Sequence, residues 1–236
     1  MLLWFESNGP HRHRRVAPPD SPLSARSPLR ASLRALRRSI PPAERRRAAT
    51  RVARNADRAL HLRPGWRVAA YWASAEELDA AALIALAERR GCRVFLPQIE
   101  RRRLGRRMRF LESTGRHRAN RFGIPEPQGP QFVSPRCLDV VFLPLVGFDR
   151  HGMRLGAGAG YYDRAFAFRR LRTAWHAPLL VGIGFALQEV ARLAAAAHDV
   201  PLDLVITERE VIRCAPALTP SSPARVSRGS RLSRAD

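Results

Sequence analysis

An α/β fold with a largely parallel β-sheet is predicted by two observations. Short apolar runs typical of buried strands alternate with longer stretches in which apolar residues recur at helical spacing. One repeat of this pattern, with strands at 66–72 and 92–96 around a helix at 77–90, predicts a β-α-β unit whose strands lie parallel. We therefore expect three layers, with helices on both faces of the sheet.

The chain of 236 residues is long enough to bury a sizeable core in one domain, which we expect to span residues 26–214. Residues 1–25 and 215–236 lack apolar periodicity and are rich in Arg, Pro and Ser, a composition typical of disordered extensions. The sequence contains no run of about 18 apolar residues, so no membrane span is predicted. Polar residues stand where a secretory signal needs its apolar centre, so we expect a cytoplasmic protein.

The sequence pattern in the first part of the domain predicts two helices. Ser27 and Pro28 suit the N-cap and first position of a helix. Its apolar stripe follows at spacings of four, three and four residues: Leu29, Leu33, Leu36 and Ile40. Two prolines then break the helix, and a second helix is expected at about 43–60. Arg26 and Arg30 lie four residues apart, so both could face one anion, although the spacing alone favours a solvated basic face.

The middle of the chain predicts the β-α-β unit and a looser connection. Gly91 follows the helix at 77–90 in the position where a left-handed residue ends a helix. Pro97 is expected to stop the strand at 92–96. A short strand at 108–110 is predicted, and the proline-rich segment 122–127 is expected to be a loop.

The last third predicts further elements in strand and helix alternation. We expect strands at 140–143, 179–183 and 204–207, and helices at 161–171 and 188–196. In open α/β sheets ligands lie at the carboxyl ends of the strands. Residues that could take part in binding or catalysis follow those ends, and they therefore predict one site: Trp72, Glu77, the glycines at 156–160, Gln188, His198 and Asp199.

The glycine-rich stretch R-L-G-A-G-A-G-Y-Y-D (154–163) lies between a predicted strand and a predicted helix. Gly156, Gly158 and Gly160 leave backbone N–H groups unshielded, and the helix dipole adds positive potential, so the stretch could cradle a phosphate. Arg154 would supply a fixed cation and Asp163 a metal-binding carboxylate. An ordinary tight turn is the alternative, because glycine also serves loops without ligands. The spacing matches neither G-x-G-x-x-G nor a P-loop.

The net charge of +22 favours polyanion binding, but its composition weakens that interpretation. All 42 basic residues are arginine, which together with abundant alanine indicates a genome rich in GC codons. We expect weak, non-specific binding to polyanions at low salt and no specific nucleic-acid partner. The three cysteines show neither metal nor disulfide spacing.

Several segments in order resemble the 5-formyltetrahydrofolate cyclo-ligase family, also called 5,10-methenyltetrahydrofolate synthetases. F-D-R-H-G-M-R-L-G-A-G-A-G-Y-Y-D-R (148–164) is similar to the signature of the family. R-S-P-L-R at 26–30, M-R-F at 108–110 and H-D-V-P-L-D at 198–203 also match, so the resemblance covers about residues 26–207. It implies a three-layer α/β fold like that of the NagB/RpiA/CoA-transferase group.

The resemblance implies an ATP- and Mg²⁺-dependent ligase of folate metabolism. Phosphorylation of the formyl oxygen of 5-formyltetrahydrofolate would be followed by ring closure to 5,10-methenyltetrahydrofolate, releasing ADP and phosphate. Such phosphoryl transfer depends mainly on positioning and charge neutralisation. The implied partner is therefore a small-molecule folate, with or without a polyglutamate tail; we expect a monomer and no membrane association.

The resemblance also implies residue roles. Arg26, Arg30 and Arg154 would hold ATP together with Leu155, Gly156, Ala157, Gly158, Ala159, Gly160, Tyr161 and Tyr162. Asp163 and Asp199 would bind Mg²⁺, a cation that prefers oxygen ligands. Ala157 to Tyr161 would also border the folate, with Trp72 and Glu77 contacting its ring. Arg154 and Tyr161 are the residues expected next to the reacting groups.

Each role has a structural alternative. Trp72 could be core, Glu77 a helix N-terminal acid and Asp199 a turn residue; His198 is expected to be structural. The family usually has lysine where this chain has Arg26, and glycine or lysine where it has Ala159, whose methyl group would be crowded if its φ were positive. Two other functions remain open: a nucleic-acid-binding protein that keeps the fold without the chemistry, and an ATP-using enzyme acting on another formylated or pterin-like substrate.

Overall fold

A computed structural model describes residues 26–102, 105–113, 117–119, 125–127, 132–171 and 177–214. The expected disordered extensions, 1–25 and 215–236, lie outside these ranges, as do residues 122–124 of the expected loop. Within the described ranges, no helix combines the length and the apolar character needed to cross a membrane.

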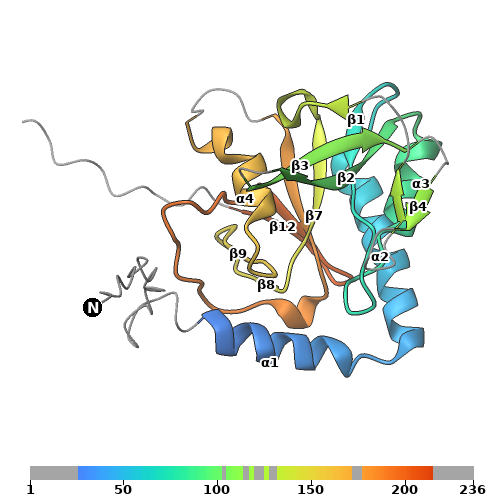
Figure 1. The fold of residues 1–236 in the computed structure, drawn as a ribbon. Coiled ribbons are helices and arrows are strands. Elements are labelled where there is room, and N and C mark those ends of the chain that lie inside the picture. The colour runs from blue at the N-terminus through green and yellow to red at the C-terminus, as the bar shows by residue number, and fades with distance from the viewer. Residues whose placement is uncertain are drawn as a thin grey trace, which may run out of the picture.

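The core of the fold is an eight-stranded sheet in the order β12-β11-β10-β7-β1-β2-β3-β6 (Figure 1). Its strands are β1 (Arg67–Ala69), β2 (Arg93–Arg102), β3 (Gly105–Glu112), β6 (Phe132–Val133), β7 (Val140–Pro144), β10 (Leu179–Ile183), β11 (Leu204–Ile206) and β12 (Val211–Arg213). The central strands from β11 to β2 pair in parallel, whereas β12, β3 and β6 pair antiparallel. This confirms the α/β class with a largely parallel sheet.

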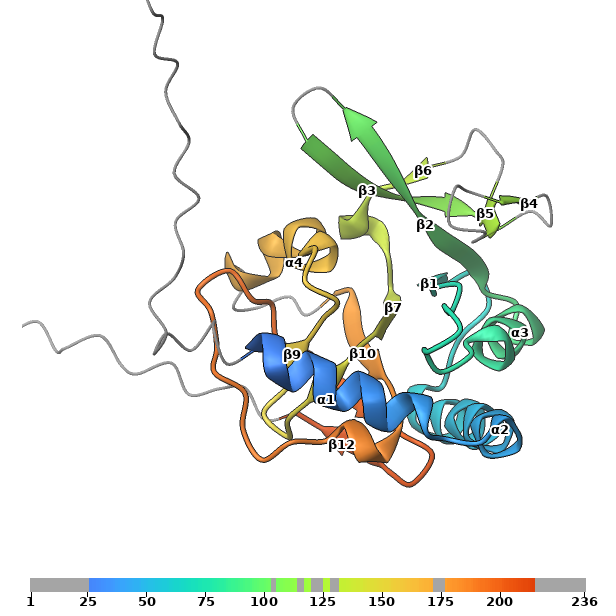
Figure 2. The ribbon, with the colours of Figure 1, turned by 60° about the horizontal axis from the view of Figure 1, so that its bottom comes forward.

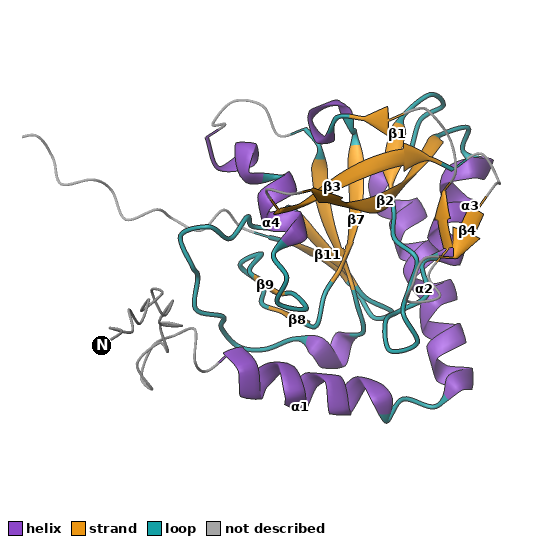
Figure 3. Cartoon of the chain, in the orientation of Figure 1, coloured by secondary structure: helices purple, strands orange, loops and turns teal. Residues whose placement is uncertain are grey.

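Helices cover both faces of the sheet (Figure 3). They are α1 (Arg26–Arg38), α2 (Pro42–Leu60), α3 (Ala81–Arg89) and α4 (Tyr161–Ala165), with 3-10 turns η1 (Pro135–Cys137), η2 (Ala167–Leu171) and η3 (Ala186–Gln188). Side chains alternate along β7: Val140 and Phe142 join the core under α2 and α3, and Val141 and Leu143 join the core under α4.

The helix α1 lies across the carboxyl end of the sheet, over the hairpin of β8 (Gly147–Phe148) and β9 (Arg154–Leu155) (Figure 2). Leu33 from α1 packs with Val146, Met153 and Leu155. Arg37 is buried and donates from Nη1 to the Leu145 carbonyl oxygen at 3.2 Å. These contacts fix α1 beside the glycine-rich stretch that follows β9.

Several element boundaries differ from the sequence prediction. The helix α1 already includes Arg26, so Ser27 and Pro28 lie in its first turn, where proline is tolerated. The strand predicted to stop at Pro97 continues to Arg102. Beyond Phe95 it has no register partner in β1 and pairs with β3 alone, so a residue without N–H fits the unpaired side.

Two other predictions were wrong. Residues 125–127, expected as loop, form β5 (Pro125–Pro127), which pairs antiparallel with β4 (His117–Ala119). The helix predicted at 188–196 is absent. Its backbone groups bond elsewhere, because Val190 N–H donates to the Phe148 oxygen at 2.9 Å and Leu193 N–H donates to Asp149 Oδ2 at 2.9 Å. Tertiary hydrogen bonds therefore override the local helix preference.

The helix expected at 161–171 also differs, since α4 ends at Ala165 and tightens into η2. The turn is marked by an i→i+3 bond from Arg169 N–H to the Phe166 oxygen at 2.9 Å. Phe166 is fully buried in the core under α4, and placing its ring there ends the regular helix.

Candidate functional site

The glycine loop, residues 156–160, connects β9 to α4. Its left-handed positions are Gly158 (φ +104°) and Gly160 (φ +63°). Among the described residues, His61 is the one non-glycine residue with positive φ, so Ala157 and Ala159 adopt ordinary backbone conformations. The methyl group of Ala159 is therefore compatible with the loop, and from Ala157 to Gly160 the alternation of alanine and glycine matches the alternation of ordinary and left-handed backbone.

An arginine from α1 holds this loop. Arg30 Nε donates to the Gly156 carbonyl oxygen at 2.9 Å, and a Cβ added at Gly158 would stand 4.0 Å from Arg30 Cζ. Burial lowers the pKa of Arg30, and the nearby charges of Arg26 and Arg34 lower it further. The loop thus lies against a cluster of cations whose mutual repulsion a bound anion would relieve.

The α1 arginines Arg26, Arg30 and Arg34 follow one another at four-residue spacing along one helix face. Within the described part of the chain, the buried Nε atoms of Arg26 and Arg34 have no acceptor. Buried donors without acceptors are uncommon in proteins and mark this face as one that a ligand oxygen could complete. Arg34 was missed as a site residue, although the same spacing that selected Arg26 and Arg30 points to it.

The carboxylate of Asp199 is bound by Arg26. Arg26 Nη2 lies 2.5 Å from Asp199 Oδ2, both side chains are 10% exposed, and Arg26 also donates to the Ala194 carbonyl oxygen. Ala196 N–H donates to the same Asp199 oxygen at 2.8 Å. Burial acts to raise the pKa of Asp199, but the hydrogen bonds from Arg26 and Ala196 outweigh it, so the pKa is lowered. Asp199 is thus held as a carboxylate.

A second buried arginine pairs with the other predicted metal ligand. Arg154 Nη2 donates to Asp163 Oδ1 at 2.6 Å, and Nη1 donates to the Val200 carbonyl oxygen. Val200 N–H donates to Asp163 Oδ1 at 3.2 Å, which ties α4 to the segment beside Asp199. Burial lowers the pKa of Arg154, while Asp163 and Asp199 act to raise it, so both carboxylates lie near this guanidinium.

The two carboxylates fit a magnesium ion bound mainly by a nucleotide. No group of three or more metal-binding side chains occurs within the described residues. Mg²⁺ bound with nucleotides keeps several waters and takes phosphate oxygens plus one or two carboxylates, so a larger protein cage is unnecessary. Asp163 and Asp199 supply ligands of that type, although arginines engage both of them in this structure.

Tyr71, Trp72 and Glu77 belong to the segment after β1, and Tyr162 belongs to α4. Glu77 Oε2 accepts from Ser74 N–H at 2.9 Å, and Tyr71 Oη donates to the Leu78 carbonyl oxygen at 2.8 Å, which fixes the turn after β1. Burial raises the pKa values of Tyr71 and Tyr162, and the Glu77 charge raises both further. The charge of Arg154 acts to lower the pKa of Tyr162, so both Glu77 and Arg154 are close enough to act on its hydroxyl group.

Trp72 is half-buried against the core under α2 and α3. This position supports the structural alternative for its indole ring at least as well as a ligand contact. The predicted strand at 66–72 ends earlier, at Ala69, so Trp72 belongs to the turn that also positions Glu77.

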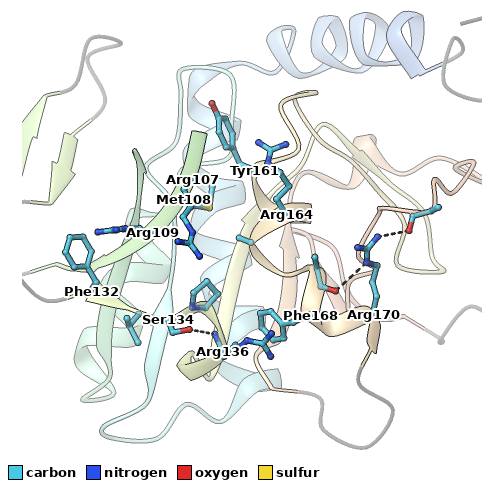
Figure 4. A pocket seen from close by; sticks show the side chains of 15 residues that line it. Arg107, Met108, Arg109, Phe132, Ser134, Arg136, Tyr161, Arg164, Phe168 and Arg170 are labelled. Carbon is cyan, nitrogen blue, oxygen red and sulfur yellow. Dashed lines mark hydrogen bonds between the residues drawn. The ribbon is translucent and has the colours of Figure 1, made fainter. Parts of the chain in front are cut away.

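A pocket of about 980 Å³ opens beside Tyr161, between β3, the 132–136 segment and α4 (Figure 4). Tyr161 begins α4, directly after the glycine loop, and Arg164 Cζ lies 5.2 Å from the centre of its ring. The pocket volume is at the upper end of the roughly 300–1,000 Å³ usual for small-molecule sites. The glycine loop therefore contacts the arginines of α1, and the residue directly after it, Tyr161, lines this cavity.

Two residues expected near the site are placed by structural contacts instead. Gln188 is buried and donates from Nε2 to the carbonyl oxygens of Leu145 and Val146 at 2.7 and 2.9 Å, while its Oε1 accepts from Phe185 N–H. It is a structural residue, contrary to our expectation. The side chain of His198 is 67% exposed, and its Nε2 stands 3.8 Å from Asp199 Oδ1.

Comparison with known proteins gives a consistent result. The family model described as the 5-formyltetrahydrofolate cyclo-ligase family matches residues 22–208. The 5-formyltetrahydrofolate cyclo-ligase of Haemophilus influenzae is 30% identical over 181 residues, which cover 75% of this chain and 94% of that protein. The Escherichia coli K12 protein of the same name is 36% identical over 141 residues, covering 57% and 74% of the two chains.

Solved structures agree with this match. The structure of Aquifex aeolicus 5,10-methenyltetrahydrofolate synthetase is similar with a TM-score of 0.68 at 28% identity, covering 85% of this chain and 98% of that chain. A synthetase of the same name from Mycoplasma pneumoniae has a TM-score of 0.61 at 20% identity, covering 78% and 98%, and supports the fold alone.

Proposed function

The chain belongs to the 5-formyltetrahydrofolate cyclo-ligase family, and we propose that its glycine-loop site performs the reaction for which the family is named. That reaction converts 5-formyltetrahydrofolate into 5,10-methenyltetrahydrofolate. It forms a carbon–nitrogen bond, and the family uses ATP to drive it. The observation that carries the proposal is the hydrogen bond from Arg30 to Gly156, which holds the α1 arginines against the glycine loop.

The α1 arginines and the glycine loop would bind the ATP phosphates. Arg26, Arg30 and Arg34 supply positive charge from one side, and the loop before α4 supplies backbone N–H groups from the other. The buried Nε donors of Arg26 and Arg34 would gain acceptors when phosphate oxygens arrive. Since Arg26 already forms a planar two-point contact with Asp199, its guanidinium is able to serve where the family usually has lysine.

Asp163 and Asp199 would hold Mg²⁺ together with those phosphates. The bound ion would neutralise charge that accumulates on the transferring phosphoryl group. Each carboxylate is presented by a backbone N–H as well as by an arginine: Val200 N–H for Asp163 and Ala196 N–H for Asp199. When ATP takes the arginines, these N–H groups would keep the carboxylates in place.

The chemical steps are those that membership of the family implies. The formyl oxygen of the folate attacks the γ-phosphorus, and ADP leaves. N10 of the folate then attacks the formyl carbon and loses its proton, and the carbon–oxygen bond breaks to release phosphate. Arg154, fixed by Asp163 and Val200, would stabilise the negative charge of the phosphoryl group during transfer.

The folate ring would lie on the side of Glu77, Tyr161 and the pocket next to α4. A carboxylate such as Glu77 can accept two hydrogen bonds from the amino group and ring N–H of a pterin. Its turn is fixed by Tyr71 and Ser74, so the carboxylate is presented with little loss of entropy on binding. The loop residues Ala157 to Tyr161 would then face the formyl group.

An absorbance assay for the methenyl product tests the proposal. Purified protein with ATP, Mg²⁺ and 5-formyltetrahydrofolate should form product, and omission of either ATP or Mg²⁺ should prevent it. Well-folded protein that forms no product would contradict the proposal. The nucleic-acid alternative is not favoured by the relatives; tight, sequence-selective RNA or DNA binding that resists salt would restore it.

A further inference from the structure

The side chain of Arg45, in the first turn of α2, donates hydrogen bonds to three backbone carbonyl oxygens. Its Nη1 donates to the Arg37 oxygen at 2.9 Å, and its Nη2 donates to the oxygens of Ala75 and Glu77 at 2.7 and 3.0 Å. Arg37 lies in the last turn of α1, whereas Ala75 and Glu77 lie in the turn that follows β1. Since α1 and α2 meet at a corner (Figure 1), one guanidinium joins the end of α1, the start of α2 and the turn that presents Glu77.

Hydrogen-bond geometry, rather than charge pairing, fixes the Arg45 side chain. Among the ion pairs in the part of the chain that the structure describes, none includes Arg45. The planar guanidinium carries several N–H donors in a fixed fork, so it can bind several carbonyl oxygens at once. Its Cζ also lies 5.5 Å from the ring centre of Phe185, a buried residue just after β10, and this ring restricts the orientation of the guanidinium further.

The other described contacts of this turn act on it in different ways. Glu76 pairs with two arginines of α1 at 3.2 and 2.9 Å, but its side chain is 34% exposed, and partly exposed pairs contribute little. Ser74 N–H donates to Glu77 Oε2 at 2.9 Å, and Glu77 N–H donates to the Ser74 oxygen at 3.0 Å, which closes the turn on itself. Arg45 instead ties the main chain of Glu77 to a helix.

The two ends of this connection carry residues of the proposed site. The helix α1 carries the arginines proposed to bind the ATP phosphates, and the turn after β1 carries Glu77, proposed to bind the pterin ring. A binding group that is held in place before the ligand arrives loses less conformational freedom on binding, so the ligand binds more tightly.

We propose that Arg45 is a positioning residue for the folate substrate, which holds Glu77 in its place relative to α1 without touching either substrate. This inference rests on the proposed function, because it takes Glu77 as the residue that binds the pterin. Since the pterin lies away from the reacting formyl group, the effect of Arg45 falls on substrate binding rather than on the chemical step.

Kinetics of single variants test the first part of this proposal. Arg45→Met removes the donors while keeping a long side chain, and it should raise the KM for 5-formyltetrahydrofolate about tenfold. The KM for ATP and kcat should stay within about twofold, as expected for binding energy shared by ground and transition states. The control Arg46→Met removes the same charge from the next residue, which is exposed, and should change neither KM.

A double-mutant cycle with Glu77→Gln tests whether Arg45 acts through Glu77. In the Glu77→Gln background, Arg45→Met should raise the KM for the folate by less than about twofold, because the group that it positions is already lost. Denaturant unfolding checks that each variant is folded. If Arg45→Met does not fold, Arg45→Lys takes its place in the cycle, since lysine keeps the charge but is a single point donor.

The outcomes separate this inference from the proposed function. Additive effects in the cycle, an unchanged KM for the folate, or an equal rise in the KM for ATP overturn the role of Arg45 and leave the cyclo-ligase assignment standing. If the wild type binds 5-formyltetrahydrofolate without turning it over, the same cycle measured on Kd by calorimetric titration decides by the same criterion. A folded wild type that neither binds nor converts 5-formyltetrahydrofolate overturns both.

Discussion

Arg26 and Asp199 form an ion pair of 2.5 Å between the first described helix and the connection after β10, 173 positions apart in the chain. The family resemblance assigns these residues to different ligands, the phosphates of ATP and the magnesium ion. In this structure the two side chains bind each other through the same atoms that would contact the phosphates and the magnesium ion. Arg154 and Asp163 form a second pair of the same kind at 2.6 Å.

Paired in this way, the charges of these four residues are neutralised before any nucleotide arrives. Leaving four buried or half-buried charges unpaired would cost several kcal/mol of stability by typical magnitudes. Binding of a phosphate chain with its cation would exchange partners, giving arginines to phosphate oxygens and carboxylates to the metal. The number of ion pairs would be conserved, so the exchange need not carry a large energetic penalty.

The Arg26–Asp199 pair should make stability depend on acid pH. The folded-state pKa of Asp199 is lowered, so its stabilising contribution is complete above the unfolded value of about 3.9 and is lost as pH falls through the folded value. We expect Asp199→Asn to destabilise the protein by roughly 1–3 kcal/mol at neutral pH, because Arg26 loses its buried partner. Thermal unfolding of both proteins from pH 6 down to about pH 3 should show the difference shrinking only below about pH 4. A difference that stays constant to the acid end would contradict the pairing.

Asp163→Asn should abolish most turnover while leaving the fold intact. Asparagine still accepts from Val200 N–H but supplies no charge to a metal or to Arg154. We expect kcat to fall by about 10²–10³, typical of losing one electrostatic element of a transition state. Circular dichroism and the absorbance assay together check this outcome. The control is Asp57→Asn, which removes a surface partner of Arg90 and should retain full activity; full activity in Asp163→Asn would show that the metal assignment is wrong.

Much of the fold could be predicted from sequence where one local signal dominates. Buried apolar runs placed β10 and most of β7 correctly, and the two prolines that end the first predicted helix located the start of α2. The segment 188–196 could not be predicted, because its backbone bonds to Phe148 and Asp149 rather than to itself. Local preference carries no information about such partners.

In the candidate site, too, some features can be predicted from the sequence and others depend on the fold. The glycine loop and the arginine spacing on α1 are visible in the sequence, and the spacing also reaches Arg34. The pairing of Arg26 with Asp199 is not visible, since it depends on how α1 crosses the sheet. The pocket beside Tyr161 was equally hidden, because its lining residues come from β3, η1, α4 and η2, which only the fold brings together.

A methyl group in the glycine loop should affect stability differently at Gly158, which has a positive φ, and at Gly156, which does not. Gly158→Ala places a side chain at φ +104°, so we expect a loss of about 1–2 kcal/mol in unfolding free energy and a higher KM for ATP. At Gly156 a Cβ meets nothing within 4 Å, so Gly156→Ala should keep wild-type stability. Its methyl group would nevertheless enter the space of the proposed phosphate cradle and raise the KM for ATP. Denaturant unfolding and ATP titrations measure both quantities.

The control for the loop is Ala159→Gly, which tests the one departure from the family pattern within it. Ala159 has an ordinary φ, so glycine there should change the KM for ATP by less than about twofold. If Gly156→Ala leaves the KM for ATP unchanged, the loop does not approach the phosphates, and an ordinary tight turn would be the better description.

Glu77 and its neighbour Glu76 offer a matched test of the folate side. Glu77→Gln removes a charge that would accept from the pterin, so we expect the KM for 5-formyltetrahydrofolate to rise by about tenfold or more, with the KM for ATP nearly unchanged. Glu76→Gln removes the partner of Arg37 and Arg38 and should lower stability without changing either KM. A rise in the KM for ATP alone would place Glu77 on the nucleotide side, and equal effects of the two variants would reduce Glu77 to a structural acid of the turn.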